Sequence, residues 1–291
     1  MEGQVVLVTG GTGGIGWATA KGVAEQGATV VIVGRNVQRG EEAAREIWAA
    51  TGNSRVEYMQ ADLSNQADIE RLAGEFGRHY DRLDVLVNNA GGIFWERRET
   101  EDALEMTFAL NHLAYFYLTH LLLPWLVASA PARIVNVSSG AHHGARIHFD
   151  DLQQAQGYSP WRAYSQSKLA NILFTRELAR RLEGTGVTAN ALHPGFVTTG
   201  FGRAGGWIGR LIMPIVHLFA ISPEAGAQTV IHLASAPEVE GVSGKYFENR
   251  EEKRASRAAY DDEVARRLWE RSLALTGIRE PYGRVLEQLT G

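Results

Sequence analysis

Residues 9–16 read Thr9-Gly10-Gly11-Thr12-Gly13-Gly14-Ile15-Gly16, a glycine-rich stretch between a β-branched run at 4–9 and a helical pattern that starts near Ala18. Glycines at such a junction allow a tight turn and a close approach to the backbone, and the first amides of the helix attract a pyrophosphate. The stretch fits three spacings: Gly10, Gly13, Gly16; or Gly11, Gly13, Gly16; or Gly10, Gly14, Gly16. It predicts dinucleotide binding without naming a subclass.

The rest of the chain repeats this alternation of short β-branched runs and longer helical patterns. Further strands are expected at 29–33, 56–60, 85–88, 134–138 and 187–192. The segments between them are long enough for crossover helices, which make strands parallel and cover both faces of the sheet. Gly27, Gly52 and Gly186 each precede a strand, where a left-handed helix cap favours glycine. We expect one α/β domain over residues 1–291, a single-domain Rossmann fold with a doubly wound parallel sheet.

The composition limits the classes of function. A formal net charge of -4 over 291 residues argues against a nucleic-acid partner, which needs a clustered basic surface. The absence of cysteine excludes disulfides, thiolate metal ligands and a thiol nucleophile. Residues 1–4 lead into the first strand without a charged leader, and the most apolar stretches, 110–127 and 207–220, are interrupted by His, Pro or Arg and fall short of the roughly 20 apolar residues of a span. We expect a cytoplasmic protein with no transmembrane segment, and peripheral contact with a membrane stays open as an alternative.

The end of the second strand bears on the choice of nucleotide. In such folds an acid there binds the ribose 2′-hydroxyl, whereas an arginine accepts a 2′-phosphate. The sequence reads Gly34-Arg35-Asn36, with no carboxylate. NADP(H) is therefore favoured over NAD(H), the alternative being that Arg35 is a solvated loop residue. After the third strand, Asp62 with Leu63 lies where an adenine would be contacted, although an aspartate before Leu63-Ser64 equally well caps a turn.

A tyrosine and a lysine stand four residues apart in a helical segment after the fifth strand. Tyr164 and Lys168 thus share one helix face. A phenol with a pKa near 10 is a poor base at neutral pH, and a nearby cation favours the phenolate. The spacing suits a coupled acid and base. Taken alone the pair is a weak signal, because Tyr and Lys also occur at this spacing on surface helices by chance.

Three further motifs follow strand ends: Asn88-Asn89-Ala90-Gly91, Ser138-Ser139 and Pro194-Gly195. The carboxyl ends of parallel strands meet at the edge where open α/β sheets bind ligands. With the glycine stretch and the Tyr164–Lys168 pair, the chain resembles the short-chain dehydrogenase/reductase family over essentially its whole length. The resemblance implies an NAD(P)-dependent oxidoreductase that transfers a hydride between nicotinamide and an alcohol or carbonyl group.

The resemblance also implies roles for individual residues. Tyr164 exchanges the hydroxyl proton, Lys168 holds the nicotinamide ribose and lowers the pKa of Tyr164, Ser139 binds the substrate oxygen, and Asn111 anchors a relay water. On the residues alone, Asn111 reads as a helix-surface residue and Ser139 as a strand end. The cofactor-binding set implied with them is Gly10, Thr12, Gly14, Ile15, Gly16, Arg35, Asp62, Leu63, Asn88, Ala90, Gly91, Pro194, Gly195, Val197 and Thr199.

One departure from the common family pattern points to a branch. Tyr164 comes 25 positions after Ser139, roughly twice the usual spacing. The longer segment, which holds His142-His143, resembles the retinol dehydrogenase branch, as do residues 167–171 and 193–195. This implies a small apolar alcohol, aldehyde or ketone, such as a retinoid or steroid. His142, His143 and His148 match no standard ligand spacing, so no metal is expected.

Three segments lie outside these motifs. Residues 200–222 combine glycine with large apolar side chains, which predicts a substrate lid or, equally, a core or dimer helix, and Ser222-Pro223-Glu224 reads as a capped helix start. Residues 248–271 carry charges of alternating sign at helical spacing, which predicts a solvated helical tail over about 250–280. The helix around Asn111 is apolar on most sides, so we expect a second subunit to cover it and the chain to form a dimer or tetramer.

Two rival functions stay open at this point. One is a nucleotide-binding Rossmann protein without catalysis, because a fold alone does not guarantee activity. The other is a redox-neutral epimerase or dehydratase of the extended branch, which the Gly10, Gly13, Gly16 spacing permits.

Overall fold

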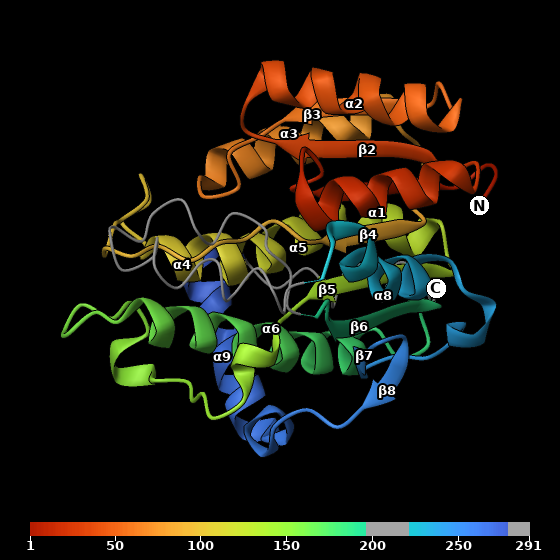
Figure 1. The fold of residues 1–291 in the computed structure, drawn as a ribbon. Helices are drawn as coiled ribbons and strands as arrows, with labels where there is room; N and C mark the ends of the chain where they lie inside the picture. The colour runs from red at the N-terminus through yellow and green to blue at the C-terminus, as the bar shows by residue number, and fades with distance from the viewer. Residues whose placement is uncertain (196–220, 279–291) are drawn as a thin grey trace.

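The computed structural model describes residues 1–195 and 221–278. Within these residues eight strands form one sheet in the order β3-β2-β1-β4-β5-β6-β7-β8, and every neighbouring pair except β7–β8 is parallel (Figure 1). This confirms the expected Rossmann-type α/β fold. The strands are β1 Val5–Thr9, β2 Thr29–Gly34, β3 Val56–Gln60, β4 Val85–Asn88, β5 Ala132–Val137, β6 Val187–His193, β7 Tyr246–Glu248 and β8 Glu251–Lys253.

Helices cover both faces of the sheet. The helices are α1 Gly14–Glu25, α2 Val37–Thr51, α3 Gln66–His79, α4 Met106–Phe108, α5 Ala114–Ala128, α6 Pro160–Arg181, α8 Pro223–Ser235 and α9 Asp262–Thr276, with a π-helical turn η1 Ala109–Leu113 and short 3-10 turns η2 Gly140–His142, η3 Phe149–Asp151, η4 Pro237–Val239 and η5 Arg257–Tyr260. Alternate residues of a strand point to opposite faces. Val6 and Val8 therefore pack under α1, α2 and α8, whereas Val5 and Leu7 pack under α3, α5 and α6.

Local sequence signals fix the element ends. Gly27, Gly52 and Gly186 have φ of +84°, +72° and +77°, the left-handed conformations expected of them. Ser222 accepts a hydrogen bond from the backbone N–H of Ala225 and caps α8, as the Ser-Pro-Glu signature predicts.

The C-terminal region differs from the expectation of one solvated helix. Residues 248–271 contain the end of β7, then β8 and η5, and only α9 is a long helix. Asn249 and Arg250 have φ of +52° and +66°, which makes a two-residue turn between β7 and β8. The residues of β8 are all charged, so no hydrophobic alternation indicates a strand there. The helical spacing of the charges therefore predicted the wrong structure for this segment. Residues 279 and 280 lie outside the described residues.

The cover of α5 also differs from the expectation. Its apolar side chains are buried within this one chain, by α3 on one side and by α9 on the other. Trp269 of α9 packs its ring 5.0 Å from that of Phe116, centre to centre. A second subunit is therefore not needed to cover this helix, and the apolar character of α5 does not support an oligomer. Self-association of the chain stays a prediction. None of the helices in the described part of the chain has the length and apolar character needed to cross a bilayer.

Candidate active site

The glycine stretch forms the turn between β1 and α1. Gly10 and Gly14 have φ of +65° and +56°. A Cβ on Gly16 would lie 2.2 Å from the carbonyl oxygen of Gly10, so the loop closes on itself only with glycine there. No side chain caps α1, whose first amides are thus free of a side-chain partner among the described residues. With Thr12 and Ile15 partly exposed beside them, these residues fit a pyrophosphate of a dinucleotide.

Asn89 ties this loop to the end of β4. Its Nδ2 donates to the carbonyl of Thr9, and the backbone amides of Asn89 and Ala90 both donate to Oγ1 of Thr9. The sequence reading named Asn88 instead. The side chain of Asn88 is fully buried and donates to Thr119 and Asn136, so only its backbone is available to a nucleotide. Asn88 shares its face of β4 with the core residue Leu86, two positions earlier, and strand alternation was the signal that could have found this.

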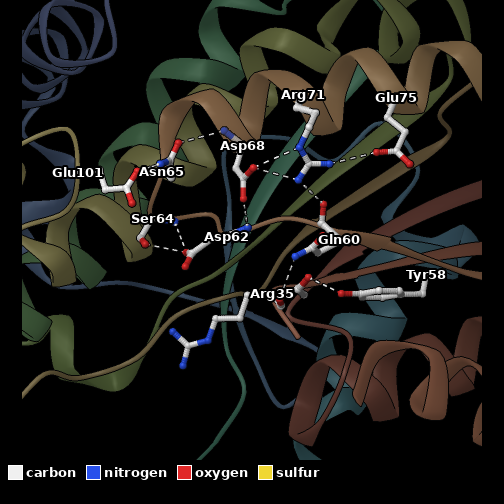
Figure 2. Close-up of polar contacts among 11 residues, drawn as sticks. Arg35, Tyr58, Gln60, Asp62, Ser64, Asn65, Asp68, Arg71, Glu75 and Glu101 are labelled. Atoms are coloured by element: carbon white, nitrogen blue, oxygen red, sulfur yellow. Dashed lines mark hydrogen bonds and ion pairs between the residues drawn. The ribbon is translucent and has the colours of Figure 1, made fainter. Parts of the chain in front are cut away.

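The ends of β2 and β3 form the expected adenosine side. Arg35 is exposed, and its guanidinium points away from the polar network beside it (Figure 2). Asp62 makes a turn in which its Oδ1 accepts from both N–H and O–H of Ser64, the capping role left open by the sequence. Leu63 points into the core and offers only its backbone. Of these predicted contacts, Arg35 alone presents a charged side chain that is not committed to another group in the described residues.

A second arginine reaches the same place from α2. Nε of Arg39 donates to the carbonyl of Thr12, and a Cβ on Gly13 would lie 2.4 Å from its guanidinium. The sequence reading missed Arg39, because the contact joins positions 27 residues apart. The Arg39 guanidinium thus lies against the glycine loop, while Arg35 is exposed at the end of β2.

The proposed catalytic side chains meet at the carboxyl edge of β4 and β5. Tyr164 and Lys168 lie on adjacent turns of α6, both buried, and Nζ of Lys168 is 5.6 Å from the centre of the Tyr164 ring. Nζ donates to the carbonyl of Val137 at the end of β5, 3.1 Å away. Ser139 follows directly, and its hydroxyl hydrogen-bonds the phenol of Tyr164. The structure thus brings these three predicted residues together.

Asn111 completes the group from the π-helical turn before α5. Its Oδ1 accepts from the backbone N–H of Gly92, and its Nδ2 donates to the carbonyl of Gly92 and to Oγ of Ser167. A Cβ on Gly91 would lie 2.9 Å from Oδ1 of Asn111 and 3.5 Å from Nζ of Lys168, so glycine is needed between them. Asn111 is fully buried, which excludes the helix-surface reading. π-Turns often occur at functional sites.

The titration of the pair differs from the sequence reading. Burial raises the pKa of Tyr164, and the hydrogen bond from Ser139 opposes that rise. Burial lowers the pKa of Lys168 to about 7. The ammonium alone therefore does not bring the phenol to a low pKa, because desolvation penalises both charged forms.

Some predicted elements fall at or beyond the end of the described residues. Pro194 and Gly195 follow β6 at the same sheet edge, and Gly195 has φ of +87°. Val197, Thr199 and residues 200–220 of the proposed lid lie outside the described residues.

A separate cavity of about 730 Å³ opens at the opposite, amino-terminal edge of β5 and β6. Its cations are already engaged: Arg176 and Arg180 pair with Asp262, Lys245 pairs with Glu252, and Arg133 donates to the carbonyls of Leu233 and Ala236. We assign it no role. No three potential ligand side chains gather as a metal site in residues 1–195 and 221–278.

A nucleotide loop and a buried tyrosine–lysine pair at one sheet edge are the arrangement of an NAD(P)-dependent oxidoreductase. The sequence profile of the short chain dehydrogenase family matches residues 4–205. The chain belongs to this family.

Relatives and solved structures narrow the comparison. Human retinol dehydrogenase 13 is 45% identical over 98% of this chain and 88% of its own, and human retinol dehydrogenase 11 is 45% identical over 96% and 87%. The structure of an uncharacterized protein from Mycobacterium paratuberculosis superposes with a TM-score of 0.78 at 34% identity, over 96% of this chain and 95% of its own. The RhlG/NADP complex of Pseudomonas aeruginosa superposes with a TM-score of 0.67 at 31% identity, over 85% of this chain and 94% of its own. The retinol dehydrogenase-like assignment within the family follows.

Proposed function

We propose that the chain is an NADP(H)-preferring oxidoreductase that interconverts a small apolar alcohol with its aldehyde or ketone, with Tyr164 as the acid and base. The observation that carries this is the contact of Ser139 with Tyr164 beside the buried Lys168. Three groups able to bind oxygen or move a proton meet where parallel sheets bind ligands.

The chain's own residues supply the proton chemistry. When bound, the nicotinamide cofactor gives or takes the hydride. In the reducing direction the phenol of Tyr164 gives its proton to the substrate oxygen while the hydroxyl of Ser139 donates a hydrogen bond to it, and in the oxidising direction Tyr164 takes the proton back. Both groups are already in hydrogen-bond contact, so they face one common position.

Lys168 and Asn111 support this pair. The Lys168 ammonium, held by the carbonyl of Val137, stabilises the Tyr164 phenolate when charged, and the pKa of about 7 puts its titration near neutral pH. Asn111 hydrogen-bonds both the N–H and the carbonyl of Gly92, and so fixes the loop after β4 next to Lys168. We assign these two residues to positioning and electrostatics.

The preference for NADP(H) is supported by the charges at the end of β2. Arg35 presents an exposed guanidinium there, and Arg39 lies against Thr12 and Gly13. A 2′-phosphate pairs well with planar guanidinium groups, whereas a ribose hydroxyl would call for the acid that residues 34–36 lack. The NADP of the RhlG complex, a relative at 31% identity, is consistent with this assignment.

An apolar substrate is supported by aromatic surface next to the phenol. Trp161 is 60% exposed, and its ring centre lies 6.1 Å from that of Tyr164. An exposed tryptophan ring beside the phenol offers a large apolar face to a substrate. Because the similar human proteins are named retinol dehydrogenases, retinoids are the first substrates to try.

A paired assay tests the proposal. Oxidation of NADPH and of NADH is followed with retinal, a steroid ketone, medium-chain aldehydes and a quinone, with the Tyr164→Phe variant as control. Turnover with NADPH and an apolar carbonyl that is lost in the variant supports the proposal. Tight nucleotide binding with no turnover of any carbonyl would instead support a binding protein, and product formation without net change of the cofactor would support an epimerase.

We also propose a cytoplasmic location and self-association, which rest on the sequence alone. Cell fractionation and light scattering of the purified chain at micromolar concentration test them.

A further inference from the structure

The side chain of His142 lies between Ser139, which follows β5, and the segment that follows β8. Its Nδ1 is 2.6 Å from the carbonyl oxygen of Ser139, which also accepts the backbone N–H of His142. Its Nε2 is 3.1 Å from the backbone nitrogen of Ser256, in the segment that follows β8. One imidazole thus joins two segments that are 114 residues apart in sequence.

These contacts fix the tautomer of His142. A backbone amide only donates, so Nε2 of His142 accepts from Ser256 and carries no proton. The proton is then on Nδ1, which donates to the carbonyl of Ser139. The ring is fully buried, with the rings of His143 and Tyr246 at 4.0 and 5.0 Å, centre to centre.

Burial lowers the pKa of His142 to about 4, so the ring is neutral at physiological pH and both nitrogens are engaged. It has no site left for a metal and no proton to exchange with a substrate. Its contacts instead act on Ser139: holding the carbonyl fixes the peptide plane, and hence the direction in which the Ser139 hydroxyl points toward Tyr164.

We propose that His142 is a positioning residue, which orients Ser139 for the substrate oxygen and is itself anchored by the backbone amide of Ser256. The proposal rests on the proposed role of Ser139. Misplacing a reacting group by about 1 Å costs on the order of 100-fold in rate. Loss of the two hydrogen bonds of His142 should therefore be measurable in kcat.

A double-mutant cycle tests this. His142→Leu should lower kcat about 10- to 100-fold in the parent chain but less than about 2-fold in the Ser139→Ala background, with the NADPH dissociation constant unchanged in both. His142→Asn, whose amide nitrogen can replace Nδ1, should recover part of the loss. An equal loss in both backgrounds overturns the positioning role while leaving the proposed function intact. If Ser139→Ala itself has no effect on kcat, the role of Ser139 and this inference both fail.

A second pair of variants changes Ser256, whose backbone N–H donates to His142. Ser256 has φ of -59°, which suits proline, and Ser256→Pro removes the N–H that His142 accepts. Ser256→Ala keeps that N–H and loses a hydroxyl that has no hydrogen-bond partner among the described residues. The proline variant should lose kcat as His142→Leu does, and the alanine variant should keep it. Equal activity of the two variants overturns the inference.

Discussion

Nζ of Lys168 lies 5.6 Å from the centre of the Tyr164 ring, and both side chains are buried. Burial penalises the charged form of each, so it raises the pKa of Tyr164 and lowers that of Lys168. The free protein therefore favours a neutral phenol beside an amine that titrates near neutral pH.

Tyr164→Phe should reduce kcat by about 10²- to 10⁴-fold, because it removes the transferable proton and keeps the ring. NADPH affinity should stay within a factor of about two. Steady-state turnover and fluorescence titration of NADPH measure the two effects. Retention of more than about a tenth of the parent turnover would contradict the assignment of Tyr164 as acid and base.

Lys168→Met should show two symptoms, because it keeps an apolar stem and removes the cation. NADP(H) should bind more weakly, and the pH at which alcohol oxidation becomes fast should rise, since the phenolate of Tyr164 loses its nearby positive charge. The pH profile of oxidation and the cofactor dissociation constant are the measurements. A profile that stays in place would mean that Lys168 does not act on the phenol.

Arg35→Ala should weaken NADPH binding by about 10- to 150-fold and barely affect NADH, which corresponds to one lost charge-assisted phosphate contact of ~1.5 to 3 kcal/mol. Arg39→Ala should act in the same direction. Arg45→Ala is the matched control, because Arg45 is on the same helix with its side chain 65% exposed. Equal losses for both cofactors in Arg35→Ala would show that Arg35 is structural.

The free energy of unfolding should fall as pH drops from about 6.5 to 4. Burial lowers the pKa of His112 to about 3 and that of His120 to about 4, so in this window the unfolded chain binds protons that the folded chain does not. Each residue contributes at most ~1.4 kcal/mol per pH unit. Urea unfolding at several pH values should lose part of this slope in His112→Leu. Ser272→Ala removes one hydrogen-bond partner of His112 and keeps the buried imidazole, so this variant should keep the slope.

Trp269→Ala should destabilise the chain by about 3 to 5 kcal/mol, the usual cost of removing a buried tryptophan. Trp269 is 2% exposed and packs against Phe116, Phe174 and His120. Trp48→Ala, at a side chain 53% exposed, should change stability by less than about 0.5 kcal/mol. Urea unfolding of both variants is the test, and similar losses would mean that α9 is not part of the core.

Short-range patterns predicted the parallel sheet and the Tyr164–Lys168 pair, because strand alternation and helical spacing depend on neighbouring residues. The contacts that the sequence missed join distant positions. Arg39 reaches the glycine loop across 27 residues, and Trp269 of α9 covers α5 from more than a hundred residues away. No local pattern encodes such contacts.

Other differences from expectation have physical causes as well. The motif predicts a contact of Asn88 with the nucleotide, and the place of Asn88 two residues after Leu86 turns its side chain toward the core, which leaves only its backbone for that contact. The hairpin of β7 and β8 was read as helix because charges of alternating sign fit both structures. The strand structure of β7 depends on backbone hydrogen bonds to β6, which the side-chain pattern does not show.

The short strand β8 forms one margin of the sheet, and its three residues, Glu251, Glu252 and Lys253, are all exposed and charged. An open strand at a sheet margin can pair its free amides and carbonyls with another molecule and so seed aggregates. Three charges on so short a strand disfavour that addition. Assembly of this chain through a continuous intermolecular sheet at β8 is therefore opposed by the residues of that strand.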